Sequence, residues 1–494
     1  MHGASAGNIR SYTEMTKSIF RRKNQSVVEL FDSAPHPNKV ACVALDYAKA
    51  THTALICDGS GRRLKAAFPV SNSPEGVDFV MDRVEKICRK HLIDPKHVFF
   101  GGEACGTFAV NFVHAIEQKG FLVLSVDPGE AKQQRACFQA STDKLDLLGI
   151  AKVLLDQHGS TRTTCTNLER LLRNVTRHRG DLVTAKTAVS NRIHSLVDQL
   201  FPHFLDEAQS GIPAFSETSL WLMEDRFSPK QVLARQLRTT VAQAKKKGLG
   251  KPEECIRKLT IHAESVLQPV PEWVGTLQTA LHHEVQLYRS LLNCIVQADR
   301  QSALLLARTP AAMLTTIKGI GITLAAGTGS EIGAPATQPS LRQLSSYAGI
   351  VPRVKQTGGP DGAARHGTVS RRCNHLLKNA AVQSANHLGQ HGPEDLKEDH
   401  RRRGANGQHA DFGMARRFLR IGMNLMRTGQ CYIPAPLRSH PDPDELTAYY
   451  LKSWLRLRDI WKKAGALEEA FDPDNPLGHW RECVQELYEI ELPL

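Results

Sequence analysis

Long apolar runs are missing from this 494-residue sequence, since none approaches the ~20 residues that a membrane-spanning helix needs. The first 38 residues are polar, include the basic run Arg21-Arg-Lys23, and lack the apolar core of a signal peptide. We therefore predict no contact with a membrane, a cytoplasmic location, and a flexible basic arm over residues 1–38.

Patterned cysteine and histidine sites are missing as well. The 11 cysteines form no Cys-x-x-Cys pair, so the sequence indicates neither a zinc ribbon nor a disulfide framework, and we expect reduced thiols. His387 and His391 lie one helical turn apart, but no glutamate follows the first, so the metalloprotease pattern is absent. We interpret them as core or surface histidines.

Positive charge is in excess and unevenly distributed. The chain has 63 Lys+Arg against 50 Asp+Glu, a formal charge of +13, which suggests a polyanionic partner such as nucleic acid. Residues 352–428 hold 14 basic and 6 acidic residues, so most of the excess lies in this region. Residues 441–494 reverse the sign, with 12 acidic and 6 basic residues. We predict that residues 435–494 form an appended acidic helical tail.

The segment from Val40 to Val70 has the pattern of three consecutive strands. Val40 to Leu45 is an apolar run of strand length, and Asp46 interrupts it. A second apolar segment, residues 53–57, ends at a turn-rich stretch, and residues 64–70 form a third. A meander with an acidic residue at the end of its first strand is typical of ribonuclease-H-like nucleases and of actin-like kinases. An aspartate that only caps a turn is the alternative.

A second acidic residue follows a second buried strand. Residues 98–100 form an apolar run that leads to Glu103, between predicted helices over residues 73–92 and 107–119, and residues 121–126 predict a further strand. Downstream, Asp143 and Asp146 are three residues apart and share one face of a predicted helix.

Asp46, Glu103, Asp143 and Asp146 are thus the four candidate catalytic acids. Parallel strands end at the same edge of a sheet, and a packed helix can bring two more carboxylates there. Clustered carboxylates repel one another unless cations neutralise them, and Mg²⁺ prefers oxygen ligands. Two such ions can hold the attacking and leaving oxygens of a phosphodiester. We predict magnesium as the cofactor.

The middle of the chain, residues 161–310, is predicted to be helical. Apolar residues recur every seven positions from Leu168 to Leu196, as in a coiled-coil seam, although Arg179 and Lys186 weaken the companion positions. Residues 201–270 are more mixed, and residues 271–308 predict a second long helix that returns antiparallel to the first. A plain spacer and a dimerising arm are both open for this pair.

Residues 317–325 match a helix-hairpin-helix motif, in which Gly319 and Gly321 permit a tight turn whose N–H groups face a phosphate, with Lys318 beside them. A glycine-rich helix cap is the alternative. The basic region beyond offers further candidate phosphate contacts, for which a solvated face is the alternative. These candidates are Arg353, Lys355, Arg371, Arg372, Arg401, Arg402, Arg403, Arg416, Arg417 and Arg420.

Taken together, Ala44-Leu-Asp46, Gly102-Glu103, and Ser141-Thr-Asp143-Lys-Leu-Asp146 resemble the three acidic blocks of the DEDD transposases of the IS110 insertion-sequence family. Residues 317–321, 347–353 and 404–432 resemble the second domain of that family. The resemblance covers roughly residues 39–434. It implies a RuvC-like domain over 39–160, a helical coiled-coil region over 161–310, and a mostly helical transposase domain over 311–434.

The resemblance also implies a function. Members of this family are RNA-guided recombinases, in which a non-coding RNA pairs with double-stranded donor and target DNA, and cleavage proceeds through a covalent protein–DNA link. We therefore expect DNA, a guide RNA and a second or further copies of this chain, as a dimer or tetramer, as partners at the nucleoid.

The family nucleophile is a serine that precedes a glycine, and Thr357 occupies that position here. Threonine offers an equivalent hydroxyl, but its methyl group restricts χ1 and crowds the line of attack. Ser345, Ser346 and Ser370 are weaker substitutes. The resemblance implies that the four acids lie beside this hydroxyl.

Three rival functions remain open from the sequence. A RuvC-like endonuclease would hydrolyse branched DNA without Thr357, and a catalytically inactive descendant of a transposase would only bind nucleic acid. An actin-like kinase needs a glycine-rich phosphate loop on a second matching domain, and none is visible in the sequence.

Overall fold

The computed structural model divides into two units, Met1–Thr164 and Cys165–Leu494. It describes residues 23–103, 107–135, 143–161, 167–224, 227–333, 340–355, 365–369, 373–403 and 407–493. Across these ranges, no helix combines the length and the apolar character needed to cross a membrane.

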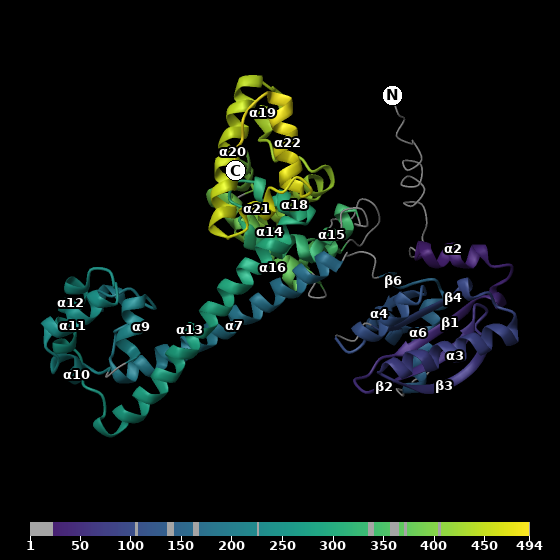
Figure 1. Ribbon diagram of the computed structural model, residues 1–494, viewed down its shortest axis with the longest axis horizontal. Coiled ribbons are helices and arrows are strands. Elements are labelled where there is room, and N and C mark those ends of the chain that lie inside the picture. The colour runs from purple at the N-terminus through teal and green to yellow at the C-terminus, as the bar shows by residue number, and fades with distance from the viewer. Residues whose placement is uncertain are drawn as a thin grey trace. The chain divides into compact units, whose positions relative to one another are not determined.

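The N-terminal unit is built on a six-stranded mixed sheet, ordered β3-β2-β1-β4-β5-β6 (Figure 1). β1–β2, β2–β3 and β5–β6 are antiparallel, whereas β1–β4 and β4–β5 are parallel. The predicted three-stranded meander and the two strands after it are confirmed. The strands are β1 (Ala41–Asp46), β2 (Thr51–Asp58), β3 (Arg63–Ser71), β4 (Val98–Glu103), β5 (Leu122–Val126) and β6 (Ser160–Thr161).

Side-chain alternation along β1 gives the sheet two apolar faces. Val43 and Leu45 share a core with residues of α3 (Pro74–His91) and α4 (Val110–Gln118). Cys42 and Ala44 share the opposite core with residues of α2 (Gln25–Ser33), α5 (Pro128–Arg135) and α6 (Asp143–Leu155). A strand buried on both faces explains the unbroken apolar run in the sequence.

Helix α2 lies within the segment that the sequence predicted to be a flexible arm. The side chain of Asn24 accepts hydrogen bonds from the N–H groups of Ser26 and Val27, at 3.1 and 3.4 Å, and caps the helix. Val27 is fully buried, and Phe31 packs edge-on against Phe99. A nine-residue helix with one fully buried side chain has too short an apolar pattern to stand out in the sequence.

Two glycines in β4 allow close packing on both faces of the sheet. A Cβ atom on Gly101 would collide with the side chain of Leu154 in α6. A Cβ atom on Gly102 would collide with the ring of Tyr47 and lie 2.5 Å from the carbonyl oxygen of Leu45. Because the second obstacle includes backbone, Gly102 cannot be enlarged without separating β1 from β4.

We predict that Gly102→Ala destabilises the N-terminal unit by about 1–3 kcal/mol, the usual cost of overpacking. Hydrogen exchange should show loss of protection at the amides of β1 and β4. Gly275→Ala is the control, since an added Cβ meets no atom within 4 Å there. Unchanged protection of β1 and β4 in Gly102→Ala would contradict this account.

The C-terminal unit begins with two long antiparallel helices, α7 (Asn167–Leu200) and α13 (Pro271–Ala307) (Figure 1). Their direction follows from two ion pairs, Arg179–Asp299 at 2.5 Å and Arg192–Glu284 at 2.8 Å, because later residues of α7 meet earlier residues of α13. The antiparallel return predicted from the sequence is therefore confirmed. Of the heptad positions from Leu168 to Leu196, only Val189 is fully buried.

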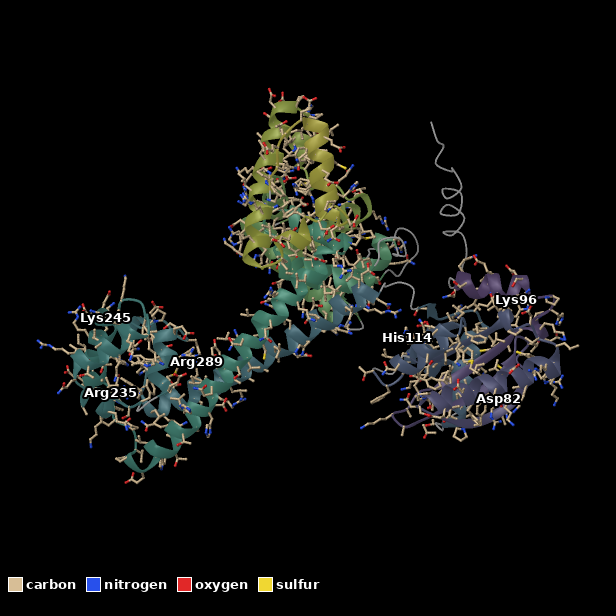
Figure 2. All side chains as sticks on the ribbon, in the orientation of Figure 1. Asp82, Lys96, His114, Arg235, Lys245 and Arg289 are labelled. Carbon is tan, nitrogen blue, oxygen red and sulfur yellow. The ribbon has the colours of Figure 1, made fainter. Side chains whose placement is uncertain are left out.

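In the described residues between α7 and α13, five short helices share a core with the adjoining ends of both long helices. They are α8 (Glu207–Ser210), α9 (Glu217–Glu224), α10 (Pro229–Leu233), α11 (Leu237–Lys246) and α12 (Pro252–Ser265). Arg289 of α13, labelled in Figure 2, pairs with Glu217 and Glu224 of α9 at 2.6 and 2.7 Å. This contact fastens the insertion to the long helix pair.

The helices among the remaining elements share a single core that extends into the acidic tail, where Trp454 and Trp461 are buried. Arg456 of the tail donates to the carbonyl oxygens of Thr315 and Thr316, at 3.0 and 2.8 Å. The tail is thus an integral part of this core. The elements are η6 (Pro310–Thr316), α14 (Ile322–Ile332), α15 (Leu341–Tyr347), β7 (Pro352–Lys355), β8 (Arg365–Val369), α16 (His375–His391), α17 (Glu394–Arg402), α18 (Gly407–Thr428), α19 (Ala435–Ser439), α20 (Pro443–Lys463), α21 (Leu467–Ala470) and α22 (Pro476–Tyr488).

A buried carboxylate, Glu331, joins α14 to two other helices. Arg177 of α7 donates to both of its oxygens, at 2.8 and 3.0 Å, and Asn374, the N-cap of α16, donates at 2.8 Å. Burial raises the pKa of Glu331, but these hydrogen bonds outweigh burial, and the pKa lies below its ordinary value.

We predict that Glu331→Gln lowers the free energy of unfolding of the C-terminal unit by about 1.5–3 kcal/mol near neutral pH, the usual value of hydrogen bonds to a charged group. A carboxyl group with a lowered pKa stabilises the fold above the pKa of the unfolded chain, about 4.3. The difference from wild type should therefore shrink as the pH falls below that value. Urea denaturation followed by tryptophan fluorescence measures it, because all five tryptophans lie in this unit.

Glu394→Gln is the matched control, since Glu394 is exposed and its partners, Arg401 and Lys397, lie near the surface. We expect a change within about 0.5 kcal/mol. An equal loss in both variants would show that the Glu331 network has no special role.

Candidate active site

Asp46 and Glu103 end adjacent parallel strands. The last registered pair of β1 and β4 is Leu45 with Gly102, and each acidic residue follows directly. Alternation places Asp46 on the face of Cys42 and Ala44, and Glu103 on the face of Phe99, which is the face covered by α5 and α6. The structure therefore brings these two predicted residues together, half-buried, on one side of the sheet.

The electrostatics of Glu103 confirm this proximity. Its pKa is raised, first by burial, then by the negative charges of Asp46 and Asp127, whereas the positive charge of Arg135 opposes the shift. Asp127 directly follows β5, so it too lies at this edge of the sheet. The edge concentrates negative charge that a cation would relieve.

Helix α6 carries the other two predicted acids, beginning at Asp143. Asp146 forms an ion pair with Arg135 of α5, and both side chains are about one quarter exposed, at 24% and 22%. The side chain of Asp143 lies outside the described part of the structure. Leu147, Ile150 and Leu154 anchor α6 in the core beneath β1.

Two members of the site were missed from the sequence. Asp127 comes directly after a buried strand, as Asp46 and Glu103 do, and the same rule would have found it. Its carboxylate also accepts from the N–H groups of Gly129 and Glu130, at 2.8 and 3.2 Å, at the start of α5. Arg135 could not be identified from the sequence, because its ion pair with Asp146 depends on how α5 packs on α6.

The carboxylates at this edge of the sheet meet part of what a magnesium site requires. Among the described side chains, no three Asp, Glu, His or Cys groups stand close enough to hold a metal ion. Mg²⁺ is usually bound by one or two carboxylates together with water and substrate phosphates, so Asp46 and Glu103 suffice as protein ligands. Asp146 forms an ion pair with Arg135 through Oδ1, so a cation would compete with Arg135 for this carboxylate.

The predicted glycine turn joins η6 to α14. Gly319 has φ +94°, and an added Cβ would lie 3.2 Å from the backbone of His391 and Gly392. Gly321 is the N-cap of α14, and Lys318 beside the turn is exposed. The residues before the turn form a 3₁₀ helix, so the helix-hairpin-helix motif stays a prediction.

Arg401, Arg402 and Arg403 are less available than the sequence suggests. Arg401 pairs with Glu394, while Arg402 pairs with Glu398 and Arg403 with Asp399, both at 3.0 Å. Each of these acidic partners lies on α17 itself. A phosphate would have to displace these local partners.

Several predicted residues fall outside the described part of the structure. Thr357, Ser370, Arg371 and Arg372 belong to this group, as do the side chains of Arg353 and Lys355 in β7. Of the substitutes for Thr357, Ser345 is fully buried and donates to the carbonyl oxygen of Leu341 at 2.6 Å, so it is not an accessible nucleophile. Ser346 is exposed.

Comparison with known proteins gives two family matches, of which the first extends from the N-terminal unit into the C-terminal unit and the second lies in the C-terminal unit. Residues 43–202 match the transposase family of IS110 DEDD enzymes, and residues 311–401 match the transposase IS116/IS110/IS902 family. A protein of Streptomyces coelicolor, described as an insertion element IS110 uncharacterized 43.6 kDa protein, is 26% identical over 265 residues. The match covers 51% of this chain and 62% of that relative.

The first match begins within β1 and includes β4 and α6, so it contains all four predicted acids. The second begins at η6, includes the glycine turn and ends within α17. On these matches, which agree in family and follow in order along the chain, the protein belongs to the IS110 family of transposases.

Proposed function

We propose that this protein cleaves and rejoins DNA strands as the transposase of an insertion sequence. The observation that supports this most directly is the pair of half-buried carboxylates, Asp46 and Glu103, at the ends of adjacent strands within the matched transposase region. The mixed sheet, with its meander and an acid after the first strand, supports a RuvC-like assignment for this domain.

In this proposal Asp46 and Glu103 hold Mg²⁺, which would stabilise the charge that develops on a phosphodiester. Arg135 holds Asp146 in an ion pair and offsets part of the negative charge around Glu103. Asp127 adds negative charge at the same edge and strengthens the attraction for a cation.

We assign the attacking hydroxyl to Thr357. Attack of its Oγ1 on phosphorus would form a phosphothreonine ester, break one phosphodiester bond, and release a deoxyribose hydroxyl. The phosphothreonine ester conserves the free energy of the broken phosphodiester bond. The later joining step therefore needs no external energy source. Guidance by a non-coding RNA, which the family resemblance implies, belongs to the same proposal, as does phosphate binding at the glycine turn around Lys318.

We expect Asp46→Asn and Glu103→Gln each to reduce strand exchange by at least about 100-fold, as the loss of a preorganised charge does in other enzymes. A plasmid that carries the complete element, assayed for excision and insertion, measures this. Asp82→Asn on α3, an exposed carboxylate labelled in Figure 2, is the control and should be silent.

Glu103→Gln should also stabilise the metal-free protein near neutral pH. A carboxyl group whose pKa is raised by folding weakens the fold above the pKa of the unfolded chain, and the amide removes that charge. Hydrogen exchange at β4 in a chelating buffer should show greater protection than in wild type. Added Mg²⁺ should then protect wild type more than the variant. Equal protection by Mg²⁺ in both would contradict the metal assignment.

Thr357→Ala should abolish strand exchange and the covalent protein–DNA adduct. In wild type this adduct is detected as a protein–DNA band that persists in denaturing electrophoresis. Thr357→Ser should preserve or raise activity, because serine lacks the methyl group that restricts χ1. Thr368→Ala, at an exposed position of β8, is the control. Cleavage that survives Thr357→Ala without an adduct would favour the alternative function, a structure-specific endonuclease.

A further inference from the structure

A pocket lined by arginines lies between α18, the start of α15 and the segment that leads into α19. Its volume is about 610 Å³, and it belongs entirely to the C-terminal unit. Arg417, Arg420 and Arg427 line it from α18, and Arg438 lines it from α19. None of the described residues that line it is acidic.

Three of these guanidinium groups are uncommitted. Arg417 pairs with Asp399 at 2.7 Å, which fixes its position. Arg420, Arg427 and Arg438 are exposed and make no side-chain hydrogen bond or ion pair within the described part of the chain. Guanidinium groups bind phosphate in a bidentate manner, so a concave set of them is suited to a phosphorylated ligand.

The spacing of the pocket residues on α18 places their side chains on the same side of the helix. Arg417, Arg420, Asn424 and Arg427 are separated by three, four and three residues, so they lie along one face of the helix. The opposite wall is held in place by Asp395 of α17, whose carboxylate accepts from the hydroxyl of Tyr432 at 2.8 Å and from the N–H of Ala435 at 3.1 Å. The pocket therefore has a rigid frame.

The walls are suited to more than a phosphate group. Leu341, Ile421 and Ile433 are half-buried and give the pocket an apolar lining, while the amides of Asn424 and Gln430 are exposed beside it. A volume of this size lies within the range of about 300–1,000 Å³ typical of small-molecule sites. Apolar walls, amide groups and a set of arginines together match the base, the base edge and the phosphates of one nucleotide.

We infer that this pocket holds one unpaired nucleotide of a nucleic-acid strand, with the base against the apolar wall and the flanking phosphates on Arg420, Arg427 and Arg438. The inference rests on the proposed function only in taking nucleic acid as the partner. The same chemistry is present in single-stranded DNA, in single-stranded RNA and in a free nucleotide, so the experiment must separate these sources.

The test measures binding of the full-length protein to short fluorescent oligonucleotides in a chelating buffer, where no strand exchange is required. The probes are single-stranded DNA, single-stranded RNA of the same sequence, and a blunt DNA duplex, with AMP as the free nucleotide. A failure of the proposed catalysis would leave this measurement unaffected. Conversely, a negative binding result would leave the carboxylate site intact.

In the triple variant Arg420→Ala, Arg427→Ala and Arg438→Ala, we expect weaker binding to single strands. The slope of log affinity against log salt concentration is negative, and its magnitude should decrease by about 2, at about 0.7 for each lost phosphate contact. Arg416→Ala is the matched control, because Arg416 is an exposed residue of α18 that does not line the pocket. An unchanged slope in the triple variant, or an equal effect per residue in Arg416→Ala, would overturn the inference.

Asn424→Trp distinguishes binding inside the pocket from attraction by the overall positive charge, because the tryptophan side chain fills the pocket and leaves every charge unchanged. We expect it to weaken single-strand binding about tenfold or more, the usual scale of losing a base-binding contact, while binding to the blunt duplex is unchanged. Equal loss for duplex and single strand would overturn the inference. The other outcome is that AMP binds as tightly as the oligonucleotides and that this binding is lost in the triple variant. That result would assign the pocket to a free nucleotide and overturn its assignment to a nucleic-acid strand.

Discussion

The repulsion between two carboxylates at one edge of a sheet is the constraint on which the N-terminal unit depends. Asp46 and Glu103 follow strands that are packed on both faces, so neither can move away without breaking β1 from β4. Gly102 tightens this constraint, since it lets the ring of Tyr47 lie against β4. The fold thereby holds like charges close together, and the pKa of Glu103 is raised first by burial and then by the negative charge of Asp46.

The C-terminal unit uses buried polar groups to join segments that are far apart in the sequence. Glu331 links α14 to α7 and α16, Asp395 links α17 to the chain before α19, and Arg456 of α20 binds the carbonyl groups at the end of η6. Such groups are costly to leave unpaired, so each link fixes its partners. The acidic tail is held next to the glycine turn by Arg456, which gives its extra helices a structural role.

The sheet could be predicted because its strands are short apolar runs with turn residues between them. Asp46 and Glu103 could be found because an acid at the end of a buried strand interrupts an otherwise apolar pattern. Helix α2 could not be predicted, since its nine residues contain a single fully buried side chain. The shared core of the tail depends on tertiary contacts of Trp454 and Trp461, and an apolar helical pattern does not reveal its partner.

The arginines show most clearly why composition alone does not locate a binding surface. The sequence distinguishes the run Arg401-Arg-Arg403, but each of its members meets an acidic residue of α17. Arg420 belongs to a second basic cluster that the sequence also distinguishes, with Arg416 and Arg417, whereas Arg427 and Arg438 stand apart and leave no comparable signal. The seven-residue spacing of Arg420 and Arg427 on α18 and the segment after Tyr432 bring the three arginines around one cavity. An ion pair already formed must be broken before a phosphate can bind, whereas an exposed guanidinium exchanges only water. The unpaired charge in a concave setting, and not the densest charge in the sequence, therefore identifies the site.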